Sequence, residues 1–248
     1  MSASVRFDHR QCHMSVHAVL LDEVASLSAF HRYEDDQRYP SNRAGIASAY
    51  GSPGATRDAF GRTITAGTNL MCDGETALEG HTLLLEPRQW RDDMAGVKTR
   101  TLGLADFMKR NKYLLLFDQT LEDLIFRTAG LAADSWPSVS RVLGRWKSNS
   151  RIYNPGKAYR DAVSCAVNVL AWRRVITTAK GYLGLAPAAT EAGHKIFIIL
   201  GCDSPIVLQN RGNHYRVVGE CYVQGFMNGE IDEIVRKGHL TVTAIDLA

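Results

Sequence analysis

The sequence predicts an α+β fold in which helices from the middle of the chain pack against a mainly antiparallel β meander or small barrel. Three observations predict it: an alternating apolar segment near the start, helical periodicity in the middle, and short β-rich runs separated by turn residues at the end. The chain has 248 residues, of which 45% are hydrophobic and 22% charged, so it can bury a core. This composition excludes wholesale disorder and the collagen and coiled-coil classes.

The first predicted element is a strand over residues 13–20. Its apolar and polar side chains alternate, as in a half-buried strand, and the apolar set is Met14, Val16, Ala18 and Leu20. Because so short a strand cannot bury an apolar face alone, we expect residues 5–21 to join the sheet formed after Arg174. Residues 31–54 are interrupted by glycine, proline and polar residues, so we expect a long exposed loop there.

Residues 55–171 form the mainly helical part of the prediction. A short helix is expected over residues 56–66. Thr120, followed three residues later by Asp123, resembles a capping box that begins a second helix, and Gly130 supplies its end.

Two more helices are predicted before the β-rich part. Ser135 caps the first, which has Pro137 in its first turn. The second spans about residues 157–172 and has an apolar face at helical spacing. Its expected core residues are Tyr159, Ala162, Val163, Ala166 and Leu170.

Residues 172–248 form the β-rich part. A short helix is expected over residues 230–237 and a closing strand over residues 240–245. The other predicted strands, separated by turn residues, are 174–178, 182–185, 195–200, 205–209 and 215–223.

We expect the whole chain, residues 1–248, to form one domain, with early strands in residues 1–30. In this arrangement the helical part, residues 55–171, packs on the β-rich part, residues 172–248. The alternative is two independent modules that divide near Trp172, where the sequence pattern changes.

Net charge and cysteine content limit the class of protein. Lysine and arginine total 29 and acidic residues 26, which gives a formal charge of +3, too small to indicate a nucleic-acid-binding surface. The longest aliphatic or aromatic run, residues 196–200, is far shorter than the roughly 20 residues of a membrane helix. The five cysteines are scattered and contain no C-x-x-C pair, which argues against a disulfide framework. We therefore expect a cytoplasmic protein without a membrane segment.

A histidine and cysteine cluster near the start is the strongest metal candidate. On a helix, His9, His13 and His17 would share one face, with Cys12 beside them. The alternation of residues 13–20 predicts a strand instead, on which residues four apart stand about 13 Å from one another. Ligands that distant cannot share one ion, so neither a metal site nor a cofactor is predicted.

A basic segment near two tryptophans could indicate a nucleic-acid face. Trp146, however, falls on the apolar side of the predicted helix, so the cations form its opposite, solvated face. Nucleic acid is therefore not an expected partner. The cations are Arg141, Arg145, Lys147 and Arg151.

No familiar catalytic motif occurs in the chain. The P-loop, the dinucleotide fingerprint, the G-x-S-x-G elbow and the H-E-x-x-H metal motif are all absent from the sequence. A nucleophile pair of Cys221 with His214 has no local signature, and we interpret Cys221 as a small buried residue on a strand. No catalytic residue is predicted, and the sequence favours a protein that is not an enzyme.

The β-rich part contains one candidate recognition groove, in which charged and aromatic side chains lie on strands or at a hairpin. Its residues are Lys180, Tyr182, Glu220 and Tyr222. The competing interpretation is structural. Lys180 would then build a turn, Glu220 would pair with an arginine, and the tyrosines would cover the sheet.

Three segments in the β-rich part form a distinctive ordered set. They are 174–187 (RVITTAKGYLGLAP), 198–208 (IILGCDSPIVL) and 215–230 (YRVVGECYVQGFMNGE). This set resembles the carboxy-terminal part of fungal heterokaryon incompatibility (HET) domain proteins. Residues 5–24 and 56–63 are similar to earlier segments of the same family in the same order.

The chain also departs from the family pattern. Family members usually begin with a HET domain that has a Trp-x-Asp-x-x-Cys-Ile-x-Gln-like run, and this sequence contains no such run. Where the family tends to have Asp, His and Asp, this chain has His194, Gln224 and Asn228. Polar chemistry of the family at those positions is therefore not expected here.

The resemblance implies a cytoplasmic fungal protein related to non-self recognition and cell death. In the family, the death-inducing activity is associated with the amino-terminal HET domain. We therefore expect a non-catalytic region that acts in protein interaction or as a regulatory scaffold, with a protein partner that the sequence does not identify. The alternative is an enzyme or small-ligand-binding domain with an unrecognised pocket in the β-rich part.

Overall fold

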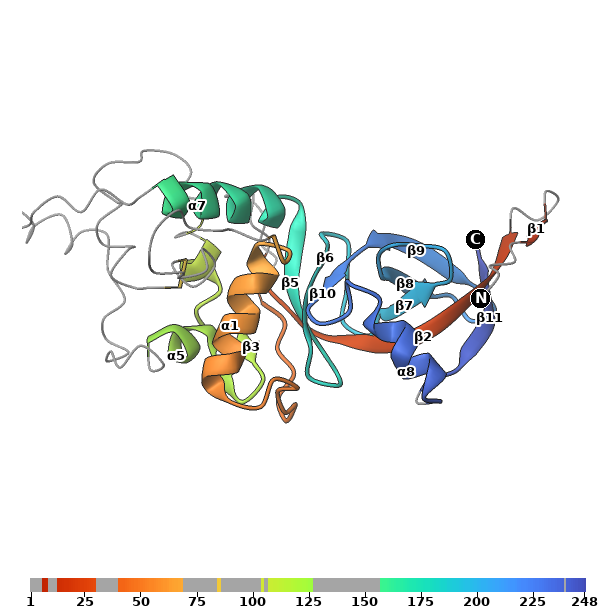
Figure 1. Cartoon of the computed structure of the whole chain (residues 1–248), viewed down its shortest axis with the longest axis horizontal. Coiled ribbons are helices and arrows are strands. Elements are labelled where there is room, and N and C mark those ends of the chain that lie inside the picture. The colour runs from red at the N-terminus through yellow and green to blue at the C-terminus, as the bar shows by residue number, and fades with distance from the viewer. Residues whose placement is uncertain are drawn as a thin grey trace, which may run out of the picture.

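The structure is a computed structural model that describes residues 6–8, 13–29, 40–68, 84–85, 104, 107–126, 157–238 and 240–248. Figure 1 shows helices at one end of the molecule and a barrel-like arrangement of strands at the other. The predicted α+β class, with a mainly antiparallel barrel-like sheet, is confirmed.

One long strand, β2 (His13–Leu27), runs through both halves of the sheet (Figure 1). Along its length it pairs antiparallel with β11 (Val242–Leu247), β7 (Lys195–Ile199) and β5 (Arg173–Thr178). Its register shifts between Leu20 and Asp22 and again between Val24 and Ser26, as at β-bulges, which bend a strand. The early segment therefore joins the sheet of the β-rich part, as predicted.

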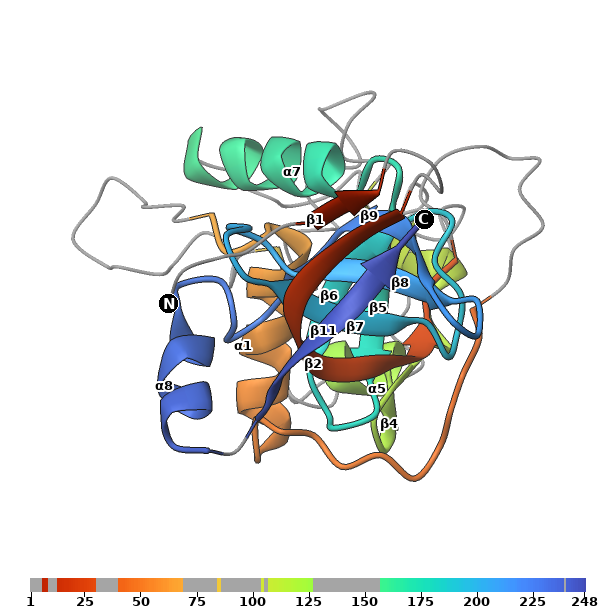
Figure 2. The ribbon, with the colours of Figure 1, turned by 90° about the vertical axis from the view of Figure 1, so that its right-hand side faces the viewer.

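A closed ring of strands forms the barrel. From β2 the pairing continues through β11 to β9 (Tyr215–Glu220), then to β8 (Ile206–Asn210) and β7, and β7 pairs with β2 again. Within the ring, only the pairing of β11 with β9 is parallel. Figure 2 views this end of the molecule, with β2 and β11 in front of the other strands of the ring. A short strand, β1 (Arg6–Asp8), pairs with the start of β2.

The second part of the sheet consists of β5, β6 (Leu183–Pro187) and β10 (Tyr222–Val223), joined to the end of β2. Successive side chains point to opposite faces, so each strand contributes to two apolar clusters. Val175 and Leu183 face the helices, whereas Ile176 and Ala186 pack with residues of the barrel. This part of the sheet is thus a buried layer between the helices and the barrel.

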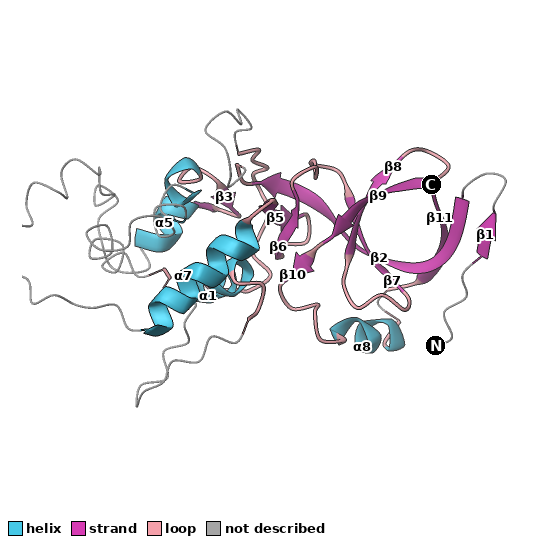
Figure 3. Ribbon diagram, turned by 90° about the horizontal axis from the view of Figure 1, so that it is seen from above, coloured by secondary structure: helices cyan, strands magenta, loops and turns pink. Residues whose placement is uncertain are grey.

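Three helices cover the outer face of that layer (Figure 3): α1 (Pro53–Ile64), α5 (Leu121–Phe126) and α7 (Lys157–Leu170). Their fully buried Phe60, Leu124 and Ala166 belong to the same cluster as Val175 of β5. The helices and the sheet therefore share one continuous core. A fourth helix, α8 (Glu230–Arg236), packs on the barrel through Ile231.

The start of α5 follows its predicted chemistry, whereas α1 begins within the predicted loop. Ser52 accepts a hydrogen bond from the Ala55 amide, and Pro53 occupies the first turn of α1, so this helix begins before the predicted residue 56. The Thr120 hydroxyl accepts from the Asp123 amide at 3.0 Å, which confirms the predicted cap of α5.

Several element boundaries differ from the prediction. β2 extends to Leu27, and past Ala18 most side chains on both of its faces are buried, with the exception of Leu20, because Val19 and Leu21 pack on the opposite side from Val16. The half-buried prediction was therefore wrong for Leu20, which is 43% exposed where the register shifts. The predicted strand over 215–223 is divided at Cys221, because β9 pairs with β8 but β10 pairs with β6.

A small hairpin of β3 (Leu115–Leu116) and β4 (Gln119–Thr120) interrupts the helical part and was not predicted. It turns through Phe117, whose positive φ of 67° is unusual for a residue with a side chain. Several predicted features lie outside the described residues. They are the loop residues 31–39, His9, Cys12, the helix end at Gly130, the helix capped by Ser135, and the basic segment from Arg141 to Arg151.

The described part of the predicted loop, residues 40–52, is irregular, as expected, but it is fastened to the sheet. Ser41 forms an isolated antiparallel β-bridge with Leu27, and the Ala49 amide donates to the Gly181 carbonyl at 3.0 Å. Gly181 has a φ of 92°, and a Cβ there would lie 2.1 Å from the Ala47 oxygen, so this contact requires glycine. None of the described helices is long and apolar enough to cross a membrane.

Asp22 connects β2 to the β5–β6 turn, and its removal tests this connection. Its carboxylate is buried and accepts from the Lys180 amide at 3.0 Å and from the Glu23 amide at 2.8 Å. Asp22→Ala leaves the Lys180 amide without this acceptor, so we expect a loss of about 1–3 kcal/mol in unfolding free energy. The exposed Asp161→Ala on α7 is the control and should change it by less than about 0.5 kcal/mol. Urea denaturation measures both, and equal stability of the two variants would contradict this role.

Candidate interaction site

Lys180 lies in the β5–β6 turn, where its side chain supports β2. Its ammonium group donates to the Leu21 carbonyl at 2.6 Å, and its amide donates to Asp22. Glu220 lies near the other end of the same hairpin, where it pairs with Arg173 at 2.7 Å. Because β5 runs from Arg173 to Thr178, the two charged groups are separated by roughly 17 Å of strand. The structure therefore does not bring these two predicted groove residues together.

The other two predicted residues, Tyr182 and Tyr222, both lie close to Tyr50, which the sequence analysis did not identify. The Tyr50 hydroxyl accepts from the Leu183 amide at 2.9 Å and donates to the Gln224 carbonyl at 3.2 Å. The Tyr222 hydroxyl donates to the Gln224 side chain. Burial raises the pKa of Tyr50 and raises that of Tyr222 to about 12, so both phenols stay protonated near neutral pH. Through Tyr50, this tyrosine cluster connects the loop of residues 40–52 to the second part of the sheet.

Cys221 and His214 lie at opposite ends of β9. His214 precedes the strand and Cys221 follows it, which separates them by roughly 20 Å. Cys221 is 2% exposed, and burial raises the pKa of its thiol to about 12. A nucleophile pair of these two residues is therefore excluded. The interpretation of Cys221 as a small buried residue is confirmed, but it lies between β9 and β10 and not on a strand.

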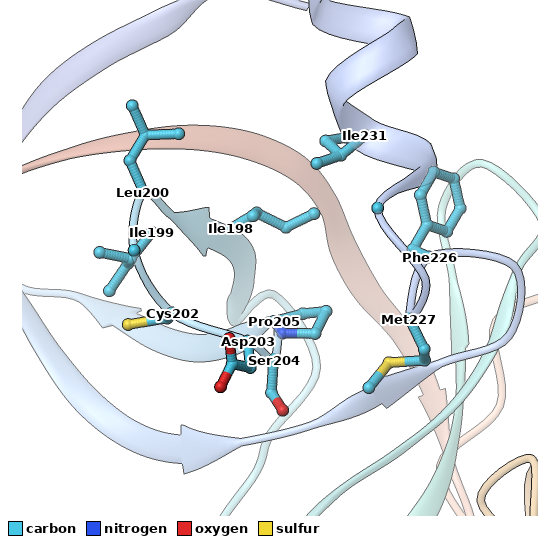
Figure 4. Close-up of a pocket in the computed structure, with 12 residues that line it drawn as sticks. Ile198, Ile199, Leu200, Cys202, Asp203, Ser204, Pro205, Phe226, Met227 and Ile231 are labelled. Carbon is cyan, nitrogen blue, oxygen red and sulfur yellow. The ribbon is translucent and has the colours of Figure 1, made fainter. Parts of the chain in front are cut away.

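A cavity of about 390 Å³ opens beside the turn between β7 and β8 (Figure 4). We call it the turn cavity. One wall comes from the end of β7 and the turn itself, and the other from the segment that leads into α8. Its lining residues are Ile198, Ile199, Leu200, Gly201, Cys202, Asp203, Ser204, Pro205, Phe226, Met227, Gly229 and Ile231.

The core of the protein holds both walls of the turn cavity in place. Ile198 and Ile231 are buried in the cluster that joins the barrel to the second part of the sheet. Phe226 belongs to the same cluster and packs edge-on against Tyr182, with ring centroids 4.7 Å apart. One residue of the predicted groove, Tyr182, thus supports the turn cavity from behind without lining it.

Most of the side chains that line the turn cavity are apolar, and its polar side chains lie in the turn, but polar atoms make up the larger part of its lining surface. Cys202 and Asp203 are exposed, and Ser204 is half-buried. Among the described lining residues none is a histidine, lysine or arginine, so the Asp203 carboxylate is the one side-chain base beside the Cys202 thiol and the Ser204 hydroxyl. The arrangement suits an apolar group in the cavity, with hydrogen-bonding partners at its rim. In the sequence, the turn cavity is marked only by the turn residues Asp203 and Ser204, which predict a break between two strands and no cavity.

Comparison with known proteins supports the resemblance that the sequence implied. Residues 141–241 match the family model of the Het-6 β-barrel domain. The heterokaryon incompatibility protein 6, OR allele, of Neurospora crassa is 33% identical to this chain over 69 residues. That match covers 26% of this chain and 10% of the Neurospora protein, so the two align over only a small part of the relative. No solved structure matches the chain. The chain therefore contains a region related to the carboxy-terminal part of HET proteins.

The contrasting exposure of Cys202 and Cys221 gives a direct test of the turn cavity. Cys202 is exposed at the rim, whereas Cys221 is buried and has a raised pKa. In the native protein, we expect iodoacetamide to alkylate Cys202 readily and to leave Cys221 unmodified, because the thiolate is the reactive form. Mass spectrometry of peptides at successive times measures both rates, with urea-unfolded protein as the control. Equal native rates for the two thiols would contradict the described site.

Proposed function

We propose that this chain is a non-catalytic, HET-related region that binds a protein partner in fungal non-self recognition. Its binding element is the turn cavity, which takes an apolar side chain of that partner. The observation that carries this proposal is a cavity lined mostly by apolar side chains beside an exposed polar turn, with no histidine, lysine or arginine among its described lining residues. Tightly bound protein partners often place one apolar or aromatic anchor in such a pocket, surrounded by a polar rim.

The rigidity of the cavity supports this role. Its walls are the end of a barrel strand and the start of α8, both anchored in the core through Ile198 and Ile231. A pocket that is already formed loses little conformational entropy when a ligand side chain enters, so more of the contact energy contributes to affinity. The exposed Asp203 can accept hydrogen bonds from the backbone of a bound segment, which adds specificity at the rim.

The cysteines support the cytoplasm as the place where the protein acts. Cys165, Cys202 and Cys221 are free thiols, and Cys202 is exposed. An exposed free thiol beside a binding surface suits a reducing compartment, where it stays unpaired.

Two variants of the turn cavity test the proposal. Ser204→Arg and Met227→Arg each place a long cation at half-buried positions of the lining, so the anchor side chain can no longer enter. The matched control is Tyr113→Arg, which carries the same new charge at a residue that is 63% exposed and away from the cavity. In pull-downs from an extract of the source organism, we expect wild type and control to retain the same protein and the two variants to retain at least about tenfold less.

Circular dichroism first establishes that wild type, the control and both cavity variants are folded, so that a difference in retention reports on binding. Retention of the partner by both cavity variants would place binding elsewhere, and the absence of any specific partner would refute protein interaction. Turnover of a small molecule by the purified chain would refute the non-catalytic part of the proposal.

A further inference from the structure

A second cavity, of about 330 Å³, opens between the loop that joins β6 to β7 and the hairpin of β8 and β9. We call it the His194 cavity. In contrast to the turn cavity, it has two arginines among its polar lining groups. Its lining residues are Ala189, Glu191, His194, Gln209, Arg211, Arg216, Val217 and Val218.

Hydrogen bonds to β2 and within its own loop fix the position of His194. The Val24 amide donates to the His194 carbonyl, and the neighbouring Gly193 amide donates to the Val24 carbonyl, both at 2.9 Å. The Glu191 amide donates to Nδ1 of the His194 ring at 3.2 Å. The backbone bonds therefore fix the position of residue 194, and the Glu191 amide fixes the orientation of the imidazole ring.

The other ring nitrogen, Nε2, is a buried donor with no hydrogen-bond partner. His194 is 7% exposed, and Nε2 makes no hydrogen bond in the structure. Burial lowers the pKa of His194, an effect that Glu191 opposes and Arg211 increases, so the ring is neutral near neutral pH. Because Nδ1 accepts a hydrogen bond, the neutral ring carries its proton on Nε2. A buried donor without an acceptor destabilises the protein, and an incoming acceptor removes that penalty.

Cationic and amide donors lie beside this ring. Gln209 and Arg216 are directly opposite each other on β8 and β9, so their side chains share one face of the hairpin. In the part of the chain that the structure describes, neither Arg211 nor Arg216 forms an ion pair or a side-chain hydrogen bond. Guanidinium groups bind carboxylate and phosphate oxygens through two parallel hydrogen bonds.

We propose that the His194 cavity binds a small organic anion. Its oxyanion head group accepts hydrogen bonds from His194 Nε2, Arg211 and Arg216, and its carbon skeleton packs against Ala189 and Val217. The volume supports a ligand larger than a bare inorganic ion, because one water takes about 30 Å³ of liquid volume. This inference does not depend on the proposed protein-binding role of the turn cavity.

Glu191 is the acidic residue in the lining of the proposed site. Its carboxylate lies 3.9 Å from Nε2, too far for a hydrogen bond, and its side chain is 75% exposed. Nε2 itself is covered, so the ligand reaches it only after side chains around the ring shift. Glu191 therefore competes with the ligand through its negative charge. Removing that charge should strengthen binding, an effect opposite in sign to the loss of either arginine.

The test titrates the full chain, labelled with ¹⁵N, with phenyl phosphate and follows the histidine ring nitrogens by NMR. We expect the His194 Nε2 resonance to shift and the affinity to fall about tenfold or more in Arg211→Gln and Arg216→Gln. Glu191→Gln should bind more tightly than wild type. Arg236→Gln, at an exposed position of α8, is the matched control and should bind as wild type does. His194→Gln assigns the resonance by its disappearance.

Three further probes sharpen the result. Phenol, which lacks the oxyanion, should not bind, and inorganic phosphate should bind more weakly than phenyl phosphate because it lacks the apolar part. Benzoate has a carboxylate in place of the phosphate head group. Whichever of benzoate and phenyl phosphate binds more tightly identifies the head group that the site prefers. The proposal is overturned if no anion shifts Nε2 at millimolar concentration, if phenol shifts it equally, or if both arginine variants bind phenyl phosphate as tightly as wild type.

Discussion

The continuous pairing of β2 is the constraint on which the rest of the structure depends. Its first part closes the barrel against β11 and β7, and its last part joins β5 in the second part of the sheet. The register shifts that bend the strand lie near Asp22, which is buried and bonds to the β5–β6 turn. Glu23, one residue further on, forms an ion pair with Lys195 of β7. One strand thus carries contacts to both halves, and its two faces contribute to separate apolar clusters.

Both cavities take their positions from this strand. β7, which forms one wall of the turn cavity, is paired along residues 18–23 of β2, and the His194 loop is bonded to Val24 of the same strand. The region that matches the Het-6 β-barrel domain, residues 141–241, contains neither β2 nor β11, yet the ring closes only when both are present. Residues outside the matched region therefore complete the barrel that holds both cavities.

Local patterns predicted most elements, whereas contacts between distant segments decided the sites. The alternation of Val16 and Ala18 and the cap at Thr120 were sufficient to place a strand and a helix, because both signals come from neighbours in sequence. The end of the half-buried pattern at Leu20 depends on a register shift against β7, which no local pattern contains. For the same reason the proposed groove was not assembled. Lys180 bonds to the Leu21 carbonyl, whereas Glu220 pairs with Arg173. The two cavities lie where a turn or a loop meets another element.

Native-state hydrogen exchange along β2 tests most directly whether this strand unites the two halves. Backbone amides in residues 16–21 report on the barrel, and those of Ser28 and Thr178, which donate to the Val175 and Tyr182 carbonyls, report on the second part of the sheet. If β2 is one cooperative element, the most protected amides of both groups open with the same free energy, equal to that of global unfolding. Opening free energies that differ between the two groups by more than about 1 kcal/mol would show that the barrel and the second part of the sheet unfold separately, and would contradict this account.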